Sequence, residues 1–124
     1  MTTPPDRAHV LVVDDEVLTA LALQRLLGRK GFRVSVAHDG RQALELHGHD
    51  RADAVVTDFR MPHMNGADLI AALRSRAPGI PVVMISGFAP DTSGLHPDPP
   101  VRLLHKPVDP EAVLDALAEW FPSR

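Results

Sequence analysis

The chain has 124 residues, of which 44% are hydrophobic and 23% charged, and 13 Lys and Arg residues against 16 Asp and Glu residues give a net charge of -3. These values fit one globular domain and exclude a multidomain enzyme or a fibrous repeat. The negative charge disfavours direct nucleic-acid binding, and the absence of cysteine excludes disulfides, thiolate zinc sites and thiol nucleophiles. Without a long apolar run or a signal-peptide pattern, we expect a cytoplasmic protein that does not bind a membrane.

The N-terminal part of the chain alternates a short apolar run with a helical pattern. Residues 10–13 form an unbroken apolar run that ends at Asp14, which favours a strand buried on both faces. Residues 17–29 follow with the spacing of an amphipathic helix, and residues 33–37 alternate apolar and polar as an edge strand does. The apolar face predicted for this first helix consists of Leu18, Leu21, Ala22 and Leu26.

The same alternation continues to the C-terminus. The further predicted elements are a helix from the N-cap Asp39 to about Gly48, a strand at 52–58, a helix from Ala67 to about Arg76, strands at 81–86 and 101–106, and a helix with Asp109 as N-cap and Pro110 in its first turn. The last helix carries Val113, Leu117, Trp120 and Phe121 on one face, which we expect to pack on the sheet.

Five short strands alternating with helices predict a doubly wound α/β fold, with a five-stranded parallel sheet and helices on both faces. The segment 87–100 contains four prolines as well as Gly94, so the fourth helix is expected to be short or replaced by a loop. We expect residues 1–8 to form a flexible arm and residues 9–122 to form the domain.

Polar side chains follow or end four of the predicted strands. Because the carboxyl ends of parallel strands meet at one edge of the sheet, these groups should lie close together. Three carboxylates at one edge repel one another unless a cation compensates, and oxygen donors without cysteine favour Mg²⁺. The residues of this predicted site are Asp14, Asp15, Asp58, Ser86 and Lys106.

Each of these residues has a simpler explanation when it is taken alone. Asp14 or Asp15 could be a helix N-cap, Asp58 could begin a turn, and Lys106 could be an exposed lysine. A cap accounts for one member of the adjacent pair only, and the joint placement of all five groups favours a site. In HGHD, by contrast, the spacing of His47 and His49 favours a solvated helix end over a metal site.

The chain resembles the receiver domains of two-component response regulators over about residues 8–122. The motifs that carry the resemblance are VVDDE at 12–16, the D-x-x-M-P-x-M-x-G pattern of Asp58, Met61, Pro62, Met64 and Gly66, Ser86 with Gly87, and Lys106 with Pro107. The resemblance implies a flavodoxin-like strand order 2-1-3-4-5. It also implies a phosphoacceptor in a two-component phosphorelay, whose partner is a histidine kinase or a histidine phosphotransfer protein.

The resemblance assigns a role to each site residue. Asp58 would accept the phosphoryl group, and Lys106 and Ser86 would contact the phosphoryl oxygens. Mg²⁺ would be bound by Asp15, Asp58 and the backbone carbonyl of Arg60, with Asp14 acting through a coordinated water. A cis peptide is expected at Lys106-Pro107, and Leu103 replaces an aromatic residue that most members of the family carry.

Two other functions remain open. One is a receiver-like interaction module that works without phosphorylation. The other is a Mg²⁺-dependent aspartyl-phosphate phosphatase, although that class requires D-x-D where this chain has Asp14, Asp15 and Glu16. As a receiver, the chain would be a phosphoacceptor and not a conventional enzyme, a monomer or weak dimer, and either a stand-alone regulator or part of a hybrid histidine kinase.

Overall fold

A computed structural model describes residues 7–87 and 100–121 of the 124-residue chain. The strands are β1 (His9–Val13), β2 (Arg33–Ala37), β3 (Ala54–Asp58), β4 (Val82–Ser86) and β5 (Val101–His105). The helices are α1 (Val17–Arg29), α2 (Gly40–His49), α3 (Gly66–Arg76) and α4 (Pro110–Trp120). Residues 1–6 of the expected arm and residues 88–99, where a short fourth helix or a loop was expected, lie outside the described part of the chain.

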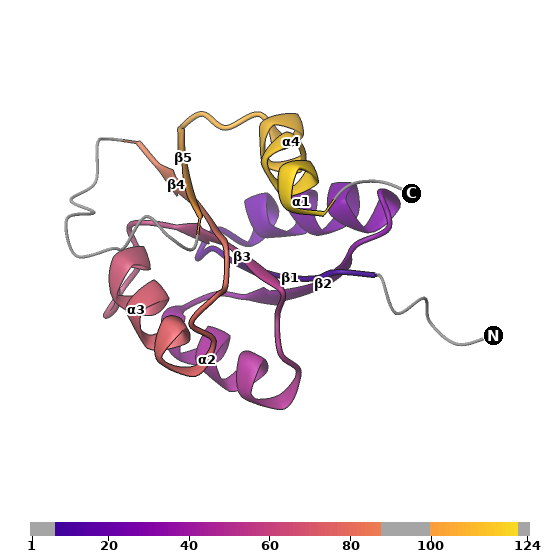
Figure 1. Ribbon diagram of the computed structural model, residues 1–124. Helices are drawn as coiled ribbons and strands as arrows, with labels where there is room; N and C mark the ends of the chain where they lie inside the picture. Colours follow the sequence, from indigo (N-terminus) through magenta and orange to yellow (C-terminus); the bar gives the residue numbers. More distant parts are fainter. Residues whose placement is uncertain (1–6, 88–99, 122–124) are drawn as a thin grey trace.

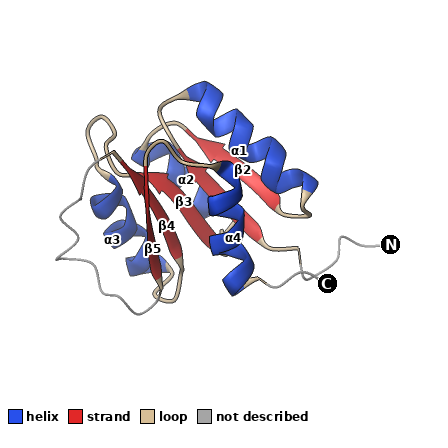
Figure 2. Ribbon diagram, turned by 90° about the horizontal axis from the view of Figure 1, so that it is seen from above, coloured by secondary structure: helices blue, strands red, loops and turns tan. Residues whose placement is uncertain are grey.

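The five strands form one parallel sheet in the order β2-β1-β3-β4-β5, as predicted. Figure 1 shows α1 and α4 on one face of the sheet and α2 and α3 on the other. Figure 2 shows the same three layers from above, with the strand arrows pointing the same way. Among the described residues, no helix is long and apolar enough to cross a membrane.

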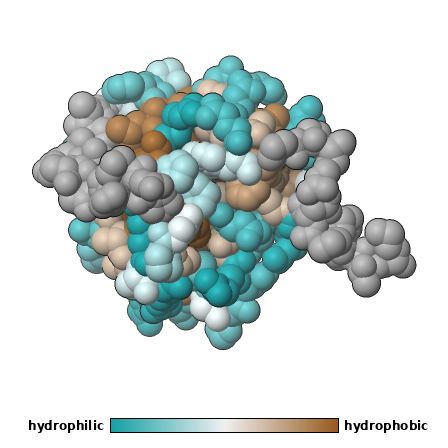
Figure 3. All heavy atoms as spheres, viewed as in Figure 1, coloured by the Kyte–Doolittle hydropathy of each residue, from teal (hydrophilic) through white to brown (hydrophobic). Residues whose placement is uncertain are grey.

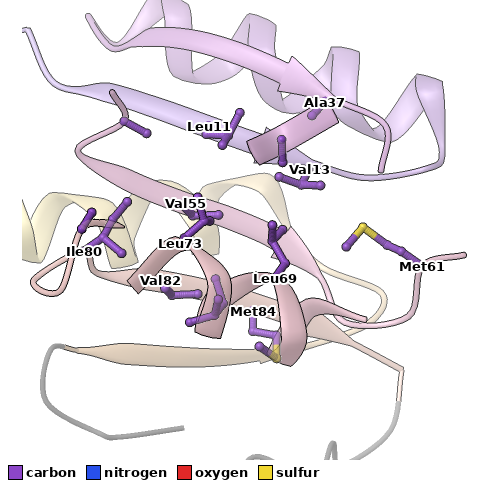
Figure 4. Close-up of a cluster of buried hydrophobic side chains, with 14 residues drawn as sticks. Leu11, Val13, Ala37, Val55, Met61, Leu69, Leu73, Ile80, Val82 and Met84 are labelled. Atoms are coloured by element: carbon purple, nitrogen blue, oxygen red, sulfur yellow. The ribbon is translucent and has the colours of Figure 1, made fainter. Parts of the chain in front are cut away.

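The sheet separates two apolar layers because successive side chains of a strand point to opposite faces. In β1, Leu11 and Val13 pack towards α2 and α3, whereas Val10 and Val12 pack towards α1 and α4. Figure 4 shows the first layer, in which the labelled residues are Leu11, Val13, Ala37, Val55, Met61, Leu69, Leu73, Ile80, Val82 and Met84. This burial on both faces explains why β1, β3 and β4 are nearly continuous apolar runs.

The apolar face predicted for α1 is wrong. The helix buries Ala20, Leu23 and Leu27, whereas Leu18 is 82% and Leu21 40% exposed. Apolar residues lie all round this helix, so two faces satisfy a helical period and the sequence alone did not choose between them.

On the face visible in Figure 3, hydrophilic residues predominate and apolar residues are exposed in small patches.

Side-chain caps begin the other helices, and the predicted caps are confirmed. Asp39 accepts a hydrogen bond from the backbone N–H of Gln42, and Asp109 accepts one from the backbone N–H of Glu111. Asn65 caps α3 in the same way. These bonds satisfy backbone donors that a helix N-terminus leaves without partners, and so fix where each helix begins.

Two buried histidines lie near the amino ends of the strands, His9 at the start of β1 and His47 in the last turn of α2. His9 is 1% exposed, and its ring nitrogens lie 2.8 Å from the Arg51 carbonyl oxygen and 2.7 Å from Ser35 Oγ. His47 is also buried, and its Nδ1 accepts a hydrogen bond from the backbone N–H of Ala52. The expectation of a solvated helix end is therefore wrong for His47, because the chain folds back over it after α2.

Candidate functional site

The predicted site residues come from four strands that end at the same edge of the sheet. Asp14 and Asp15 follow β1, Asp58 and Ser86 are the last residues of β3 and β4, and Lys106 follows β5. The register pairs Asp58 with Ile85, which places Ser86 one residue further along the neighbouring strand. The parallel topology therefore brings together residues that lie up to 92 positions apart in the sequence.

The three carboxylates converge. Asp14, Asp15 and Asp58 each offer one oxygen atom, and these atoms lie within 4.8 Å of one another. Asp14 is 3% and Asp58 4% exposed, whereas Asp15 is exposed. The Nζ atom of Lys106 lies 3.0 Å from Asp58 Oδ2 and forms a hydrogen-bonded ion pair with it. We call these four residues the acidic site.

One carboxylate oxygen of this site lacks a partner. Asp58 Oδ1 is buried and has no hydrogen-bond partner within the described residues. A buried carboxylate oxygen in this condition costs free energy, so its presence points to a group that completes the site. The Asp58 carboxylate lies in a cluster of acids with Asp14 and Asp15, which makes a cation the natural complement.

Burial and charge change the protonation behaviour of two members of the site. Burial raises the pKa of Asp14 to about 6, and the charge of Asp58 adds to this rise, although the backbone N–H of Glu16 opposes it by donating to Asp14. Burial lowers the pKa of Lys106, but the hydrogen bond from Lys106 to Asp58 and the surrounding acidic charges outweigh this effect and raise it overall. Lys106 is therefore a permanent cation beside Asp58 at neutral pH.

The residues present fit a divalent cation. The described residues supply three carboxylates, one of them with a buried oxygen that has no hydrogen-bond partner among these residues. Mg²⁺ prefers a few carboxylate ligands and keeps several waters. An oxygen-only set with an exposed member, Asp15, suits that ion.

The loop after β3 is held by contacts that only glycine permits. The backbone N–H of Gly66 donates to the Phe59 carbonyl oxygen, and a Cβ atom at Gly66 would lie 2.8 Å from the Asp58 carbonyl oxygen. The N-terminus of α3 therefore packs directly against the backbone of Asp58. This contact explains the glycine at the end of the D-x-x-M-P-x-M-x-G pattern.

The structure also bears on expectations about single residues near the site. Neither Asp14 nor Asp15 is the N-cap of α1, because Glu16 occupies that position without a side-chain cap. The Lys106-Pro107 peptide is cis, as expected. Arg60 is exposed in the loop after β3, and its carbonyl remains a predicted ligand. Leu103 is 46% exposed on β5.

Sequence reasoning missed two polar side chains next to the site. The Thr57 hydroxyl donates to the Asp58 carbonyl oxygen at 2.9 Å, and His38 Nδ1 lies 3.2 Å from the Asp14 carbonyl oxygen. The available signal for Thr57 was a hydroxyl residue in the otherwise apolar run before Asp58. His38 gave no such signal, because its contact depends on where β2 ends relative to β1.

Comparison with known protein families identifies the family of this chain. The family model of the response regulator receiver domain matches residues 10–118. The chain belongs to this family. Receiver domains are the signal-receiving parts of two-component systems, so the resemblance in the motifs and the strand order have a common explanation.

Curated relatives are longer than this receiver chain. Response regulator MprA of Mycolicibacterium vanbaalenii is 40% identical over 78 residues, which cover 63% of this chain and 34% of that protein. Transcriptional regulatory protein GlrR of Escherichia coli K12 is 32% identical over 112 residues, which cover 89% of this chain and 25% of that protein. The receiver chain thus spans about a third or less of their length.

Solved structures agree with the fold of the receiver chain. The chemotaxis response regulator CheY4 of Vibrio cholerae is similar with a TM-score of 0.79 and 30% identity, covering 90% of this chain and 97% of that one. The signal receiver domain of an HD domain-containing protein from Pseudomonas fluorescens Pf-5 gives a TM-score of 0.82 at 27% identity, covering 91% and 93% of the two chains.

Proposed function

We propose that this receiver accepts a phosphoryl group on Asp58 from a phosphohistidine of a partner protein. A carboxylate oxygen of Asp58 attacks the phosphorus atom, the P–N bond to the donor imidazole breaks, and an acyl phosphate forms. The imidazole leaves with the electrons of that bond and takes up a proton from water. The observation that carries this proposal is the buried Oδ1 of Asp58, which has no hydrogen-bond partner in residues 7–87 and 100–121, beside Lys106 and two further carboxylates.

Two side chains would act on the phosphoryl group, Lys106 of the acidic site and Ser86 at the end of β4. The Lys106 ammonium donates a hydrogen bond to Asp58 before the reaction. When the acyl phosphate forms, the Asp58 carboxylate loses its negative charge, and Lys106 can donate to a phosphoryl oxygen instead. The Ser86 hydroxyl, at the end of the neighbouring strand, would donate to another of these oxygens. Both contacts would pull the ends of β4 and β5 towards the modified residue, which is a route from phosphorylation to altered partner binding.

The proposed metal ligands are Asp15, Asp58 and the carbonyl of Arg60, with Asp14 acting through a water. Bound Mg²⁺ would supply positive charge that offsets the carboxylates and the transferring phosphoryl oxygens. The remaining contribution is positional: the strand ends hold the nucleophile and the ammonium on the same edge, where an incoming phosphate finds both.

The two rival functions are less well supported. A phosphatase of the aspartyl-phosphate type requires D-x-D after the first strand, and the residue at the second Asp position here is Glu16, which is exposed and serves as the N-cap of α1. An interaction module that works without phosphorylation gives no reason to bury Asp14 and Asp58 at a cost in stability. Membership of the response regulator family favours the phosphoacceptor.

The test is phosphorylation by a small phosphodonor. Incubation of the purified chain with acetyl phosphate and MgCl2 should add one phosphoryl group, detected by intact-mass spectrometry as a single adduct that hydroxylamine removes. Asp58→Asn should abolish the adduct, and omission of Mg²⁺ should suppress it. Sustained turnover of phosphoesters would instead favour the phosphatase, and no adduct under any condition would favour the interaction module.

A surface for the phosphohistidine donor should adjoin the acidic site. The first turns of α1, directly after Asp15 and Glu16, expose Val17, Leu18 and Leu21. We therefore expect the donor protein to cover these apolar side chains when its histidine reaches Asp58. Leu18→Ser should leave phosphorylation by acetyl phosphate unchanged but slow transfer from the histidine kinase that is fastest in phosphotransfer profiling of purified kinases. Equal transfer rates would contradict this placement.

A further inference from the structure

A buried hydroxyl lies next to the proposed phosphoacceptor without contacting its carboxylate. Thr57 is 0% exposed, and its Oγ1 donates to the backbone carbonyl oxygen of Asp58 at 2.9 Å. Its register partners on the neighbouring strands are Val13 and Met84, both members of the apolar layer under α2 and α3. A hydroxyl in such surroundings costs free energy unless it is hydrogen-bonded, and valine would fill the same volume without that cost.

The carbonyl that Thr57 contacts lies where pairing with β1 ends. The register between β1 and β3 stops at the pair of Val13 and Thr57, so Asp58 lies one residue beyond it. On the other side, the backbone N–H of Phe59 donates to the Ile85 carbonyl oxygen at 2.8 Å. The peptide unit between Asp58 and Phe59 is therefore held at both polar ends, by β4 through its N–H and by Thr57 through its C=O.

This peptide unit connects two groups of the proposed metal site, the Asp58 side chain and the loop that contains Arg60. It carries the Asp58 side chain on one side and leads to Arg60, whose carbonyl is a proposed ligand, on the other. The backbone of Gly66 packs against the same carbonyl oxygen, so a rotation of the peptide would also disturb the start of α3. Removal of a group that holds a metal ligand in place typically lowers metal affinity by about 10- to 100-fold.

We propose that Thr57 is a positioning residue of the acidic site, whose hydroxyl fixes the Asp58 peptide so that the carboxylate and the following loop hold Mg²⁺. This inference rests on the proposed function, because it concerns the same phosphoacceptor. It assigns a task to a residue that touches neither the metal nor the phosphoryl group.

The decisive variants are Thr57→Val, which keeps the shape and removes the donor, and Thr57→Ser, which keeps the donor. Ile80→Val is the matched control, because it removes one methylene from the same apolar layer at the opposite end of the sheet. Two quantities are measured: the Mg²⁺ dissociation constant, from a MgCl2 titration followed by backbone amide NMR, and the Mg²⁺ concentration that half-saturates phosphorylation by acetyl phosphate.

We expect Thr57→Val to weaken Mg²⁺ binding by about tenfold and to raise the half-saturating Mg²⁺ concentration equally, with the maximal rate restored at high Mg²⁺. Thr57→Ser and Ile80→Val should stay within about twofold of the wild type. Unchanged Mg²⁺ binding in Thr57→Val would overturn the inference. So would equal weakening in the Val and Ser variants, because packing and not the hydroxyl would then be responsible.

The wild-type protein provides a measurement that does not depend on a variant. In the metal-free state the Thr57 hydroxyl proton should exchange slowly enough to be seen by NMR, and both it and the Asp58 carbonyl ¹³C resonance should shift when MgCl2 is added. Absence of these shifts, in a protein that does bind Mg²⁺, overturns the role of Thr57 and leaves the proposed function intact. A wild-type protein that neither binds Mg²⁺ nor accepts a phosphoryl group overturns both.

Discussion

The two ends of the sheet bury polar groups to the same extent but treat them in opposite ways. At the amino end, both ring nitrogens of His9 have hydrogen-bond partners, and Nδ1 of His47 accepts from a backbone N–H. At the carboxyl end, Asp14 is buried with a pKa raised to about 6 and Asp58 has a buried oxygen without a partner in the described residues. Hydrogen-bonded groups add to stability, whereas buried charge and an oxygen without a partner in the described residues cost stability and are typical of functional sites.

The largest expected loss of stability comes from the amino end. His9→Ala removes two hydrogen bonds and leaves a cavity beside Ser35 and the Arg51 carbonyl, so it should lower the free energy of unfolding by about 3 kcal/mol. Urea denaturation followed by circular dichroism measures this change. His49→Ala is the control, because His49 is exposed in the last turn of α2 and should change stability by less than about 0.5 kcal/mol. Equal effects would contradict a structural role for His9.

At the carboxyl end, removal of a buried charged group should increase the stability of the metal-free protein. Because folding raises the pKa of Asp14 from 3.8 to about 6, the folded state binds more protons in this range, and stability falls as pH rises through it. Asp14→Asn should therefore stabilise the metal-free protein at pH 7 by about 2 kcal/mol.

The gain from Asp14→Asn should disappear near pH 4, where the wild-type carboxyl is protonated. Urea denaturation with EDTA at both pH values measures it, and Asp15→Asn, at an exposed carboxylate, serves as control. A gain of equal size at pH 4 would show that charge is not the cause.

Added Mg²⁺ should offset the stability cost of the acidic site at the carboxyl end. If the folded chain alone binds the ion, MgCl2 at about ten times its dissociation constant should stabilise the wild type by about 1.4 kcal/mol. Thermal melts with and without MgCl2 measure this shift. Asp58→Asn should lose most of it and His9→Ala should keep it, since His9 lies at the other end of the sheet; the reverse pattern would place the ion elsewhere.

The smallest effect concerns the pH dependence contributed by His47. Burial lowers the pKa of His47, and the positive charges of Arg51, Arg76 and His9 add to this, so protonation opposes folding. The stability contributed by the neutral ring is present above the unfolded value of 6.5 and declines as pH falls below it.

His47→Asn tests this contribution, because its Oδ1 atom can still accept from the Ala52 N–H while the side chain no longer titrates. We expect the double variant Asp14→Asn/His47→Asn to lose less stability between pH 6.5 and pH 5 than Asp14→Asn alone, because this background removes the opposing pH dependence of Asp14. Parallel pH profiles of the two proteins would show that His47 does not titrate in this range.

Local sequence patterns were sufficient where a single geometry satisfied them. The apolar runs predicted the buried strands, and Asp39 and Asp109 predicted helix starts through their caps. The pattern failed for α1, where apolar residues surround the helix and the buried face is Ala20, Leu23 and Leu27. It also failed for His47, because the return of the chain towards Ala52 is not visible in the spacing HGHD.

The sequence alone determined that acidic residues end the predicted strands, and parallel topology then required Asp14, Asp15, Asp58 and Lys106 to share an edge. Tertiary structure alone decided which of their atoms are buried, which oxygen of Asp58 lacks a partner among the described residues, and that the Thr57 hydroxyl donates to the Asp58 carbonyl oxygen. The reason is physical: strand alternation and chain order fix the face and the edge on which a residue lies. Burial and hydrogen bonding depend on distances between strands that only the packed sheet sets.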